Sequence, residues 1–83
     1  MMVRLHPHAR GRLVERGATE QEIVATVESG EQFPAKYERT GFRRNFSYGA
    51  EWRGKTYATK QIEAYALREE EGWLVITVII RYF

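Results

Sequence analysis

The segment WLVITVIIRYF at residues 73–83 decides the fold, because it contains the longest apolar stretch of the chain. Its length suits a buried strand and falls far short of a membrane span. Its even positions are almost wholly apolar, whereas its odd positions mix apolar, polar and charged residues. This alternation predicts a strand with one face in the core and the other face open or covered by a partner.

Further strands are predicted upstream of this segment. Residues 42–48 alternate in strand period, and residues 56–68 form a long strand that a turn at 70–72 joins to the last one. Residues 49–54 look like a turn or an irregular bend between them. The pattern predicts an antiparallel sheet of three to four strands.

The phase of the long strand determines where Glu63 lies. Ile62, Ala64 and Ala66 suit close packing in the core, which turns Glu63 toward the open face. The opposite phase would put Glu63 beside Val78 in the core, where an unpaired carboxylate is costly. We therefore expect Glu63 on the open face, although a β-bulge would undo this phase.

Two short helices are predicted before the sheet. Pro7 suits the first position of a helix over residues 7–16, and Gly17 suits its left-handed end. Thr19 and Glu22 form a capping box that begins a second helix. We therefore predict one α+β domain over residues 1–83, with an N-terminal helical hairpin packed on the antiparallel sheet. The predicted core consists of Leu13, Ile23, Val27, Leu74, Ile76, Val78 and Ile80.

Composition excludes several classes of function. The chain has 83 residues and no Cys, which rules out disulfides and thiolate zinc sites. There is no Asp, so Ser/His/Asp catalysis is unsupported, and no glycine-rich phosphate loop follows a strand. We expect no cofactor, no bound metal and no membrane association. No apolar run of signal-peptide length opens the chain, so a cytoplasmic location is expected.

Basic residues are concentrated in one part of the chain, although the net charge is only +2. Seven lie between residues 36 and 60, and ten of all thirteen are Arg, whose planar fork suits phosphate. A basic surface of this kind favours RNA as a partner, and an ordinary solvated surface is the alternative. The candidate RNA-binding residues are Arg16, Arg43, Arg44, Lys60 and Tyr57.

Two groups of residues are candidates for catalysis. His8, Arg12 and Arg16 are spaced to share one face of the first helix, where a neutral His8 would act as a base near phosphate-binding arginines. Glu63 and Arg81 are expected on the open sheet face, as a base and a stabiliser of charge in the transition state. The alternatives are a solvated helix face and a cross-strand salt bridge.

The N-terminal motifs resemble a known family. The stretches at residues 8–12 (HARGR) and 15–19 (ERGAT), with the VITVI pattern at 75–79, resemble domain-of-unknown-function family four-two-five-eight. The match covers most of the chain and departs at Ala18, where a larger aliphatic residue is usual. The family is similar in layout to RelE-like bacterial ribonuclease toxins, whose open sheet face binds RNA. The resemblance implies a toxin–antitoxin role, with His8, Arg12 and Arg16 as family positions.

These patterns lead to two hypotheses. The first is a RelE-like domain that binds RNA, alone or on the ribosome, and cleaves it without metal, with an antitoxin-like protein as a further partner. The second is a non-catalytic interaction module whose half-apolar sheet face binds a partner or a second copy of the chain. Convergence of the helix stripe and the sheet face on one cleft would favour the first hypothesis. Coverage of Trp73, Val75, Ile79 and Phe83 by a second copy would favour the second.

Overall fold

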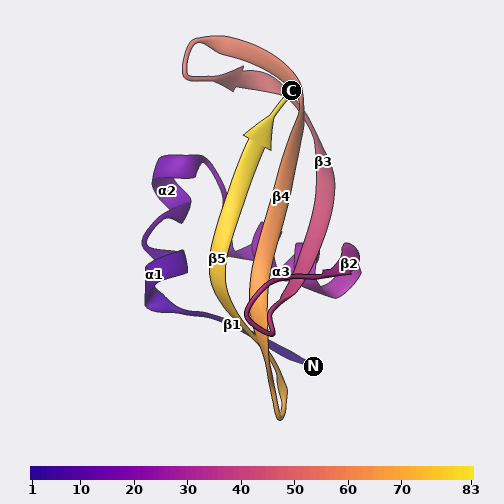
Figure 1. Ribbon diagram of the computed structural model, residues 1–83. Coiled ribbons are helices and arrows are strands. Elements are labelled where there is room, and N and C mark those ends of the chain that lie inside the picture. The colour runs from indigo at the N-terminus through magenta and orange to yellow at the C-terminus, as the bar shows by residue number, and fades with distance from the viewer.

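Five strands form one mixed sheet in the computed structural model, which describes all 83 residues (Figure 1). The sheet order is β1-β5-β4-β3-β2; β1 runs parallel to β5 and every other pair is antiparallel. Strands take up 57% of the residues and helices 22%, so the molecule is mainly sheet. The strands are β1 (Met2–Leu5), β2 (Glu31–Pro34), β3 (Thr40–Trp52), β4 (Lys55–Glu69) and β5 (Gly72–Tyr82).

Three short helices connect β1 to β2. They are α1 (Pro7–Arg10), α2 (Leu13–Arg16) and α3 (Glu20–Ser29). The capping box of Thr19 and Glu22 is present at the start of α3, as predicted. In Figure 1, α3 lies behind the sheet, and α1 and α2 lie beside β5. None of these helices has the length and apolarity that crossing a membrane requires.

The predicted helical hairpin on an antiparallel sheet is wrong. The predicted first helix is divided at Gly11 and Arg12 into two single turns, α1 and α2. Glycine is a poor helix former, and the Arg12 N–H donates to the Ala9 carbonyl, three residues back, instead of the carbonyl four residues back that an α-helix would use. Residues 2–5 form a parallel edge strand that the sequence pattern did not reveal, because four residues carry too little periodicity. The short β2 was missed for the same reason, and its Pro34 is tolerated only because β2 lies at an edge.

The core fills the space between the helices and one face of the sheet. Ile23 and Val27 of α3 pack with Ile62 and Ala64 of β4 and with Val78 of β5, all of them buried. The phase predicted for β4 is therefore correct. Leu13 is also buried, and Ile80 is partly buried against this cluster.

A β-bulge corrects the prediction for the last strand. The pairing passes from Tyr65–Thr77 to Ala66–Val75, so Ile76 is an extra residue in β5. A bulge of this kind reverses the alternation of side chains along the strand. Leu74 and Ile76 are therefore only half-buried, whereas Val75 is buried in the core. Trp73 is also in the core, edge-to-face with Phe42 at 5.0 Å between ring centroids.

The β3–β4 hairpin is longer than predicted. Residues 49–52 belong to β3, which continues through an irregularity between Ser47 and Ala50, and the turn contains only Arg53 and Gly54. The tip of the hairpin bends toward the helices, where Trp52 stacks on Tyr82 at 5.1 Å. Gly17 permits this approach, because its φ is +74° and a Cβ there would collide with the Tyr82 hydroxyl and the Trp52 ring.

Candidate nucleic-acid interface

Glu63 is the centre of an ion-pair network on the sheet face opposite the helices. Arg43 lies directly across from Glu63 on β3, and its Nε donates to Oε2 of the carboxylate at 2.7 Å. Arg81, diagonal to Glu63 on β5, places Nη1 2.9 Å from the other carboxylate oxygen, Oε1. The Tyr65 hydroxyl donates to the same oxygen at 3.0 Å. Glu63 is thus held by donors from three strands.

The carboxylate of this network is buried while its arginines remain partly exposed. The Glu63 side chain is 5% exposed, against 38% for Arg43 and 50% for Arg81. Arg43 also donates to Glu31 at 3.2 Å, but Nε and Nη2 of Arg81 make no hydrogen bond within the protein. The network therefore holds two guanidinium groups in fixed positions, with donors left over on the outer surface.

The electrostatics of the network keep Glu63 ionised. Burial by itself would raise the pKa of Glu63, but hydrogen bonds from Arg81, Arg43 and Tyr65 outweigh it and lower the pKa below the usual range. Burial and the hydrogen bond to Glu63 raise the pKa of Tyr65, so its hydroxyl stays protonated and continues to donate. A carboxylate with a lowered pKa and three donors is a weak base. Its geometry suits the positioning of arginines better than proton abstraction.

The rest of this face mixes polar and apolar side chains. The Gln61 amide nitrogen donates to the Asn45 side-chain oxygen at 3.0 Å, two residues along the strands from the network. Phe33 of β2 covers the other side, with the Arg43 guanidinium 4.6 Å from its ring centroid. The ring of Tyr65 meets Phe33 edge-on at 6.1 Å. The face thus combines amides, arginines and two aromatic rings, and none of the helices packs over it in Figure 1.

The predicted cationic stripe of the first helix is not continuous. His8 is exposed on α1, and Arg12 is exposed at the break between α1 and α2. Arg16 turns toward the sheet, where Nη1 donates to the Val78 carbonyl at 2.7 Å on the outer edge of β5. No surface hollow is lined by His8, Arg12, Glu63 or Arg81. The structure therefore does not bring the four candidate catalytic residues into one cleft.

Two further candidate RNA-binding residues, besides Arg16 and Arg43, have partners inside the protein. The Lys60 ammonium is buried and donates to the Gly17 carbonyl at 3.0 Å and to the Glu22 carboxylate at 2.9 Å. Arg44 donates to the Ser29 hydroxyl at 2.8 Å. Both residues connect the helices to the sheet. Of the five candidates, Arg43 alone belongs to the Glu63 network.

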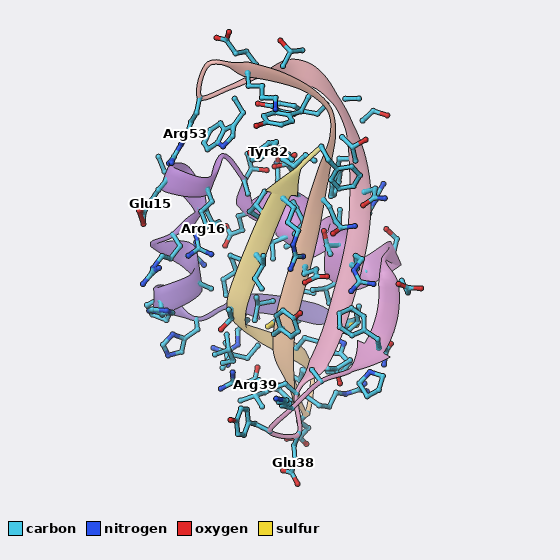
Figure 2. The ribbon with its side chains drawn as sticks, turned by 45° about the horizontal axis from the view of Figure 1, so that its top comes forward. Glu15, Arg16, Glu38, Arg39, Arg53 and Tyr82 are labelled. Carbon is cyan, nitrogen blue, oxygen red and sulfur yellow. The ribbon has the colours of Figure 1, made fainter.

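The remaining candidate, Tyr57, belongs to an aromatic cluster around Tyr82. The Tyr57 ring lies 5.7 Å from that of Tyr82, whose hydroxyl donates to the Arg16 carbonyl at 2.9 Å. Arg53 donates to the Glu15 carbonyl at 2.7 Å, and Figure 2 shows it reaching from the hairpin tip toward α2. These donors satisfy the last carbonyls of α2, so the cluster has a structural role. The sequence pattern missed it because Arg53 and Tyr82 are 29 positions apart.

Neither a metal site nor a related protein identifies the function of this face. The structure contains no group of three or more His, Cys, Asp or Glu side chains that could hold a metal ion. A scan against protein-family models, a search of curated proteins and a search of solved structures each found no match. The resemblance to domain-of-unknown-function family four-two-five-eight, with its RelE-like layout, therefore stays a prediction from the N-terminal and C-terminal motifs.

Proposed function

We propose that the chain binds single-stranded RNA on the open face of its sheet. The observation that supports this most strongly is the Glu63 network, which holds Arg43 and Arg81 on either side of one carboxylate, on a sheet face that no helix covers. Guanidinium groups bind phosphate oxygens through paired N–H donors, and Arg81 has two such donors free. Open sheet faces with amides and aromatic rings suit the bases and sugars of an unpaired strand.

The charged centre of this face favours RNA over an apolar protein partner. The interaction-module hypothesis depended on a half-apolar surface that included Trp73 and Val75. Both residues are buried in the core, whereas Leu74 turns to the opposite side and is half-buried there, so the apolar side chains left on the open face include Leu74, Ile79 and Phe83. The centre of the face is the charged Glu63 network, whereas the buried centre of a stable protein interface is mainly apolar.

We propose that the chain binds RNA without cleaving it. His8 and Arg12 belong to the helical layer, and both carboxylate oxygens of Glu63 already accept from the network, so no candidate base with an unoccupied oxygen or ring nitrogen faces the two arginines. RNA incubated with the protein should therefore be recovered intact, both free and on ribosomes. Cleavage in the presence of a chelator would overturn this part of the proposal.

A salt series measures the contribution of the open face directly. Binding of a fluorescent single-stranded RNA should weaken steeply with salt, because phosphate contacts release counterions. Arg81→Ala should flatten the slope of log K against log salt by about 0.7 for one lost phosphate contact. Arg81→Lys should retain the slope and lose affinity, because it keeps the charge without the fork.

Arg10→Ala is the matched control for this experiment. Arg10 is 57% exposed and paired with Glu20 at 2.7 Å, so it resembles Arg81 in exposure and pairing but lies on α1. The slope of log K against log salt for Arg10→Ala should equal that of the wild type. RNA that does not bind at low salt, or equal slopes for all variants, would contradict the proposal.

A further inference from the structure

A hollow of about 430 Å³ lies beside the network, between the sheet and the loop that joins β2 to β3. Its volume is in the range of small-molecule sites. Three aromatic rings and two cations contribute to its lining: Phe33, Tyr37, Tyr65, Lys36 and Arg39. Tyr65 connects the hollow to the network through its hydrogen bond to Glu63. Gly41 allows the Phe33 ring to lie flat on the sheet, because a Cβ at this position would collide with it.

The loop holds one of these rings in an unfavourable backbone conformation. Tyr37 and the next residue, Glu38, both have φ of 60°, a region that side-chain-bearing residues rarely adopt. The Ala35 N–H closes the loop on the Arg39 carbonyl at 3.0 Å. This pair of positive φ values is what a type I′ hairpin turn requires, and the Arg39 N–H closes that turn on the Lys36 carbonyl at 3.2 Å. Tyr37 lies at the tip of the loop and is 81% exposed, so its ring is open to a ligand.

Arg39 carries an unsatisfied donor in the same loop. Its Nε is buried and has no hydrogen-bond partner, although most buried polar atoms in proteins have one. Its guanidinium lies 6.0 Å from the centroid of the Tyr37 ring. The one acidic residue among 33–39 is Glu38, and Figure 2 shows its side chain projecting outward from the loop. The hollow is therefore aromatic and cationic at once, with an acceptor missing at Arg39.

We propose that this hollow binds one nucleotide, with the base stacked on Tyr37 and the phosphate held by Arg39 and Lys36. An aromatic ring is the surface on which an unpaired base stacks, and the two cations complement a phosphate. The inference rests on the proposed RNA function, because the hollow and the Glu63 network share one face. A strand that contacts Arg81 and Arg43 would place one unstacked nucleotide in the hollow.

Titration of the full chain with adenosine 5′-monophosphate at low salt tests this site. The expected result is saturable binding with shifts of the Tyr37 and Tyr65 ring resonances. Adenosine alone and inorganic phosphate alone should each bind more weakly than the nucleotide. Equal binding of phosphate and nucleotide would show a plain anion site and would overturn the stacking role of Tyr37.

Two variants at residues with the same backbone conformation separate the effect of the Tyr37 ring on nucleotide binding from the effect of the loop backbone. Tyr37→Gly removes the stacking surface and should weaken nucleotide binding about tenfold, as loss of one base–aromatic stack does. Glu38→Gly relaxes the same backbone conformation without removing a ring, so it should bind at least as tightly as the wild type. Both variants should stay folded, because glycine accepts a positive φ. Equal nucleotide affinity in the two variants would overturn the proposal.

The same variants distinguish this site from the RNA function. If the oligonucleotide binds with a normal salt slope but the mononucleotide does not bind, the hollow is not a nucleotide site and the RNA proposal stands. The opposite result is that the mononucleotide binds, that Tyr37→Gly weakens this binding, that the oligonucleotide binds no more tightly than the mononucleotide, and that Arg81→Ala does not change oligonucleotide binding. In that case the nucleotide site in the hollow is supported and the RNA proposal fails.

Discussion

The two faces of β4 bury charge in different ways. On the covered face Lys60 is 6% exposed, and its ammonium joins the Gly17 carbonyl at the end of α2 to the Glu22 carboxylate at the start of α3. On the open face Glu63 is 4% exposed, and it holds two arginines whose outer surfaces remain in solvent. The first charge fastens helices to the sheet, whereas the second positions cations for something outside the molecule.

This difference explains why the two charges have different expected roles. The partners of Lys60 are all internal, so a ligand has nothing to contact there. Arg81 keeps two nitrogens free and half of its side chain exposed. Buried ion pairs contribute little net stability compared with apolar packing, so a network that displays arginines at the surface invites a functional explanation.

The largest predicted effect tests which side chains of β5 face the covered side. Trp73→Ala should destabilise the protein by about 3 to 5 kcal/mol, because it leaves a cavity against Phe42 and loses a large buried surface. Leu74→Ala should cost less than half as much, because Leu74 is half-buried on the opposite side. Denaturant unfolding measures both. The reverse order would place Trp73 on the open face and Leu74 in the core, and it would contradict the bulge at Ile76.

A smaller effect is expected at the centre of the open face. Glu63→Gln should destabilise the protein by about 1 to 2 kcal/mol near neutral pH, because charged hydrogen bonds are lost to arginines that solvent partly screens. The lowered pKa of Glu63 means that this stability is present above about pH 4.5, the ordinary carboxyl value, and disappears as the pH falls through the folded-state pKa. The free energy of unfolding of Glu63→Gln should therefore fall less between pH 6 and pH 3 than that of the wild type.

Glu20→Gln is the control for this pH experiment. Glu20 pairs with Arg10 at 2.7 Å, but its side chain is 46% exposed, so the change should alter stability by no more than about 0.5 kcal/mol. If the acid dependence of Glu63→Gln matched that of the wild type, Glu63 would not be the titrating group of the open face, and the comparison between the two faces would lose its basis.

The smallest predicted effect concerns the loop beside the open face. Tyr37→Gly should leave the protein as stable as the wild type or raise the free energy of unfolding by up to about 1 kcal/mol, because glycine relieves the left-handed conformation at an exposed position. Thermal unfolding checks this. A clear loss of stability would mean that the Tyr37 ring packs for structural reasons, and the loop would no longer suggest a ligand.

Much of the fold could be predicted from local patterns, and the misses have physical causes. Local chemistry predicts the N-cap of α3 at Thr19 and the left-handed end of α2 at Gly17. The cost of burying a lone carboxylate predicts that Ile62, and not Glu63, faces the core. The parallel strand at residues 2–5 and the bulge at Ile76 depend on pairing partners about 70 and 11 positions away, which no local pattern encodes.

The site was predictable only in part for the same reason. Glu63 and Arg81 share a face as expected, because strand phase places them there. Arg43 was predicted as an RNA contact, but its position opposite Glu63 depends on the register of β3. Lys60 looked like a surface cation because its sequence neighbours are polar, and only the packing of α2 and α3 shows that it is buried.

The most direct test of the account is to map which face of the sheet RNA contacts. ¹⁵N-labelled protein would be titrated with a single-stranded RNA of ~8 nucleotides, a length within the usual site size of a single-strand-binding domain. Binding on the open face predicts large shifts for the side-chain amides of Asn45 and Gln61 and for the Arg81 guanidinium, with little change at Gln21 on α3. Shifts confined to α1, α2 and α3, with Asn45, Gln61 and Arg81 unmoved, would contradict the assignment of the open face as the RNA-binding surface.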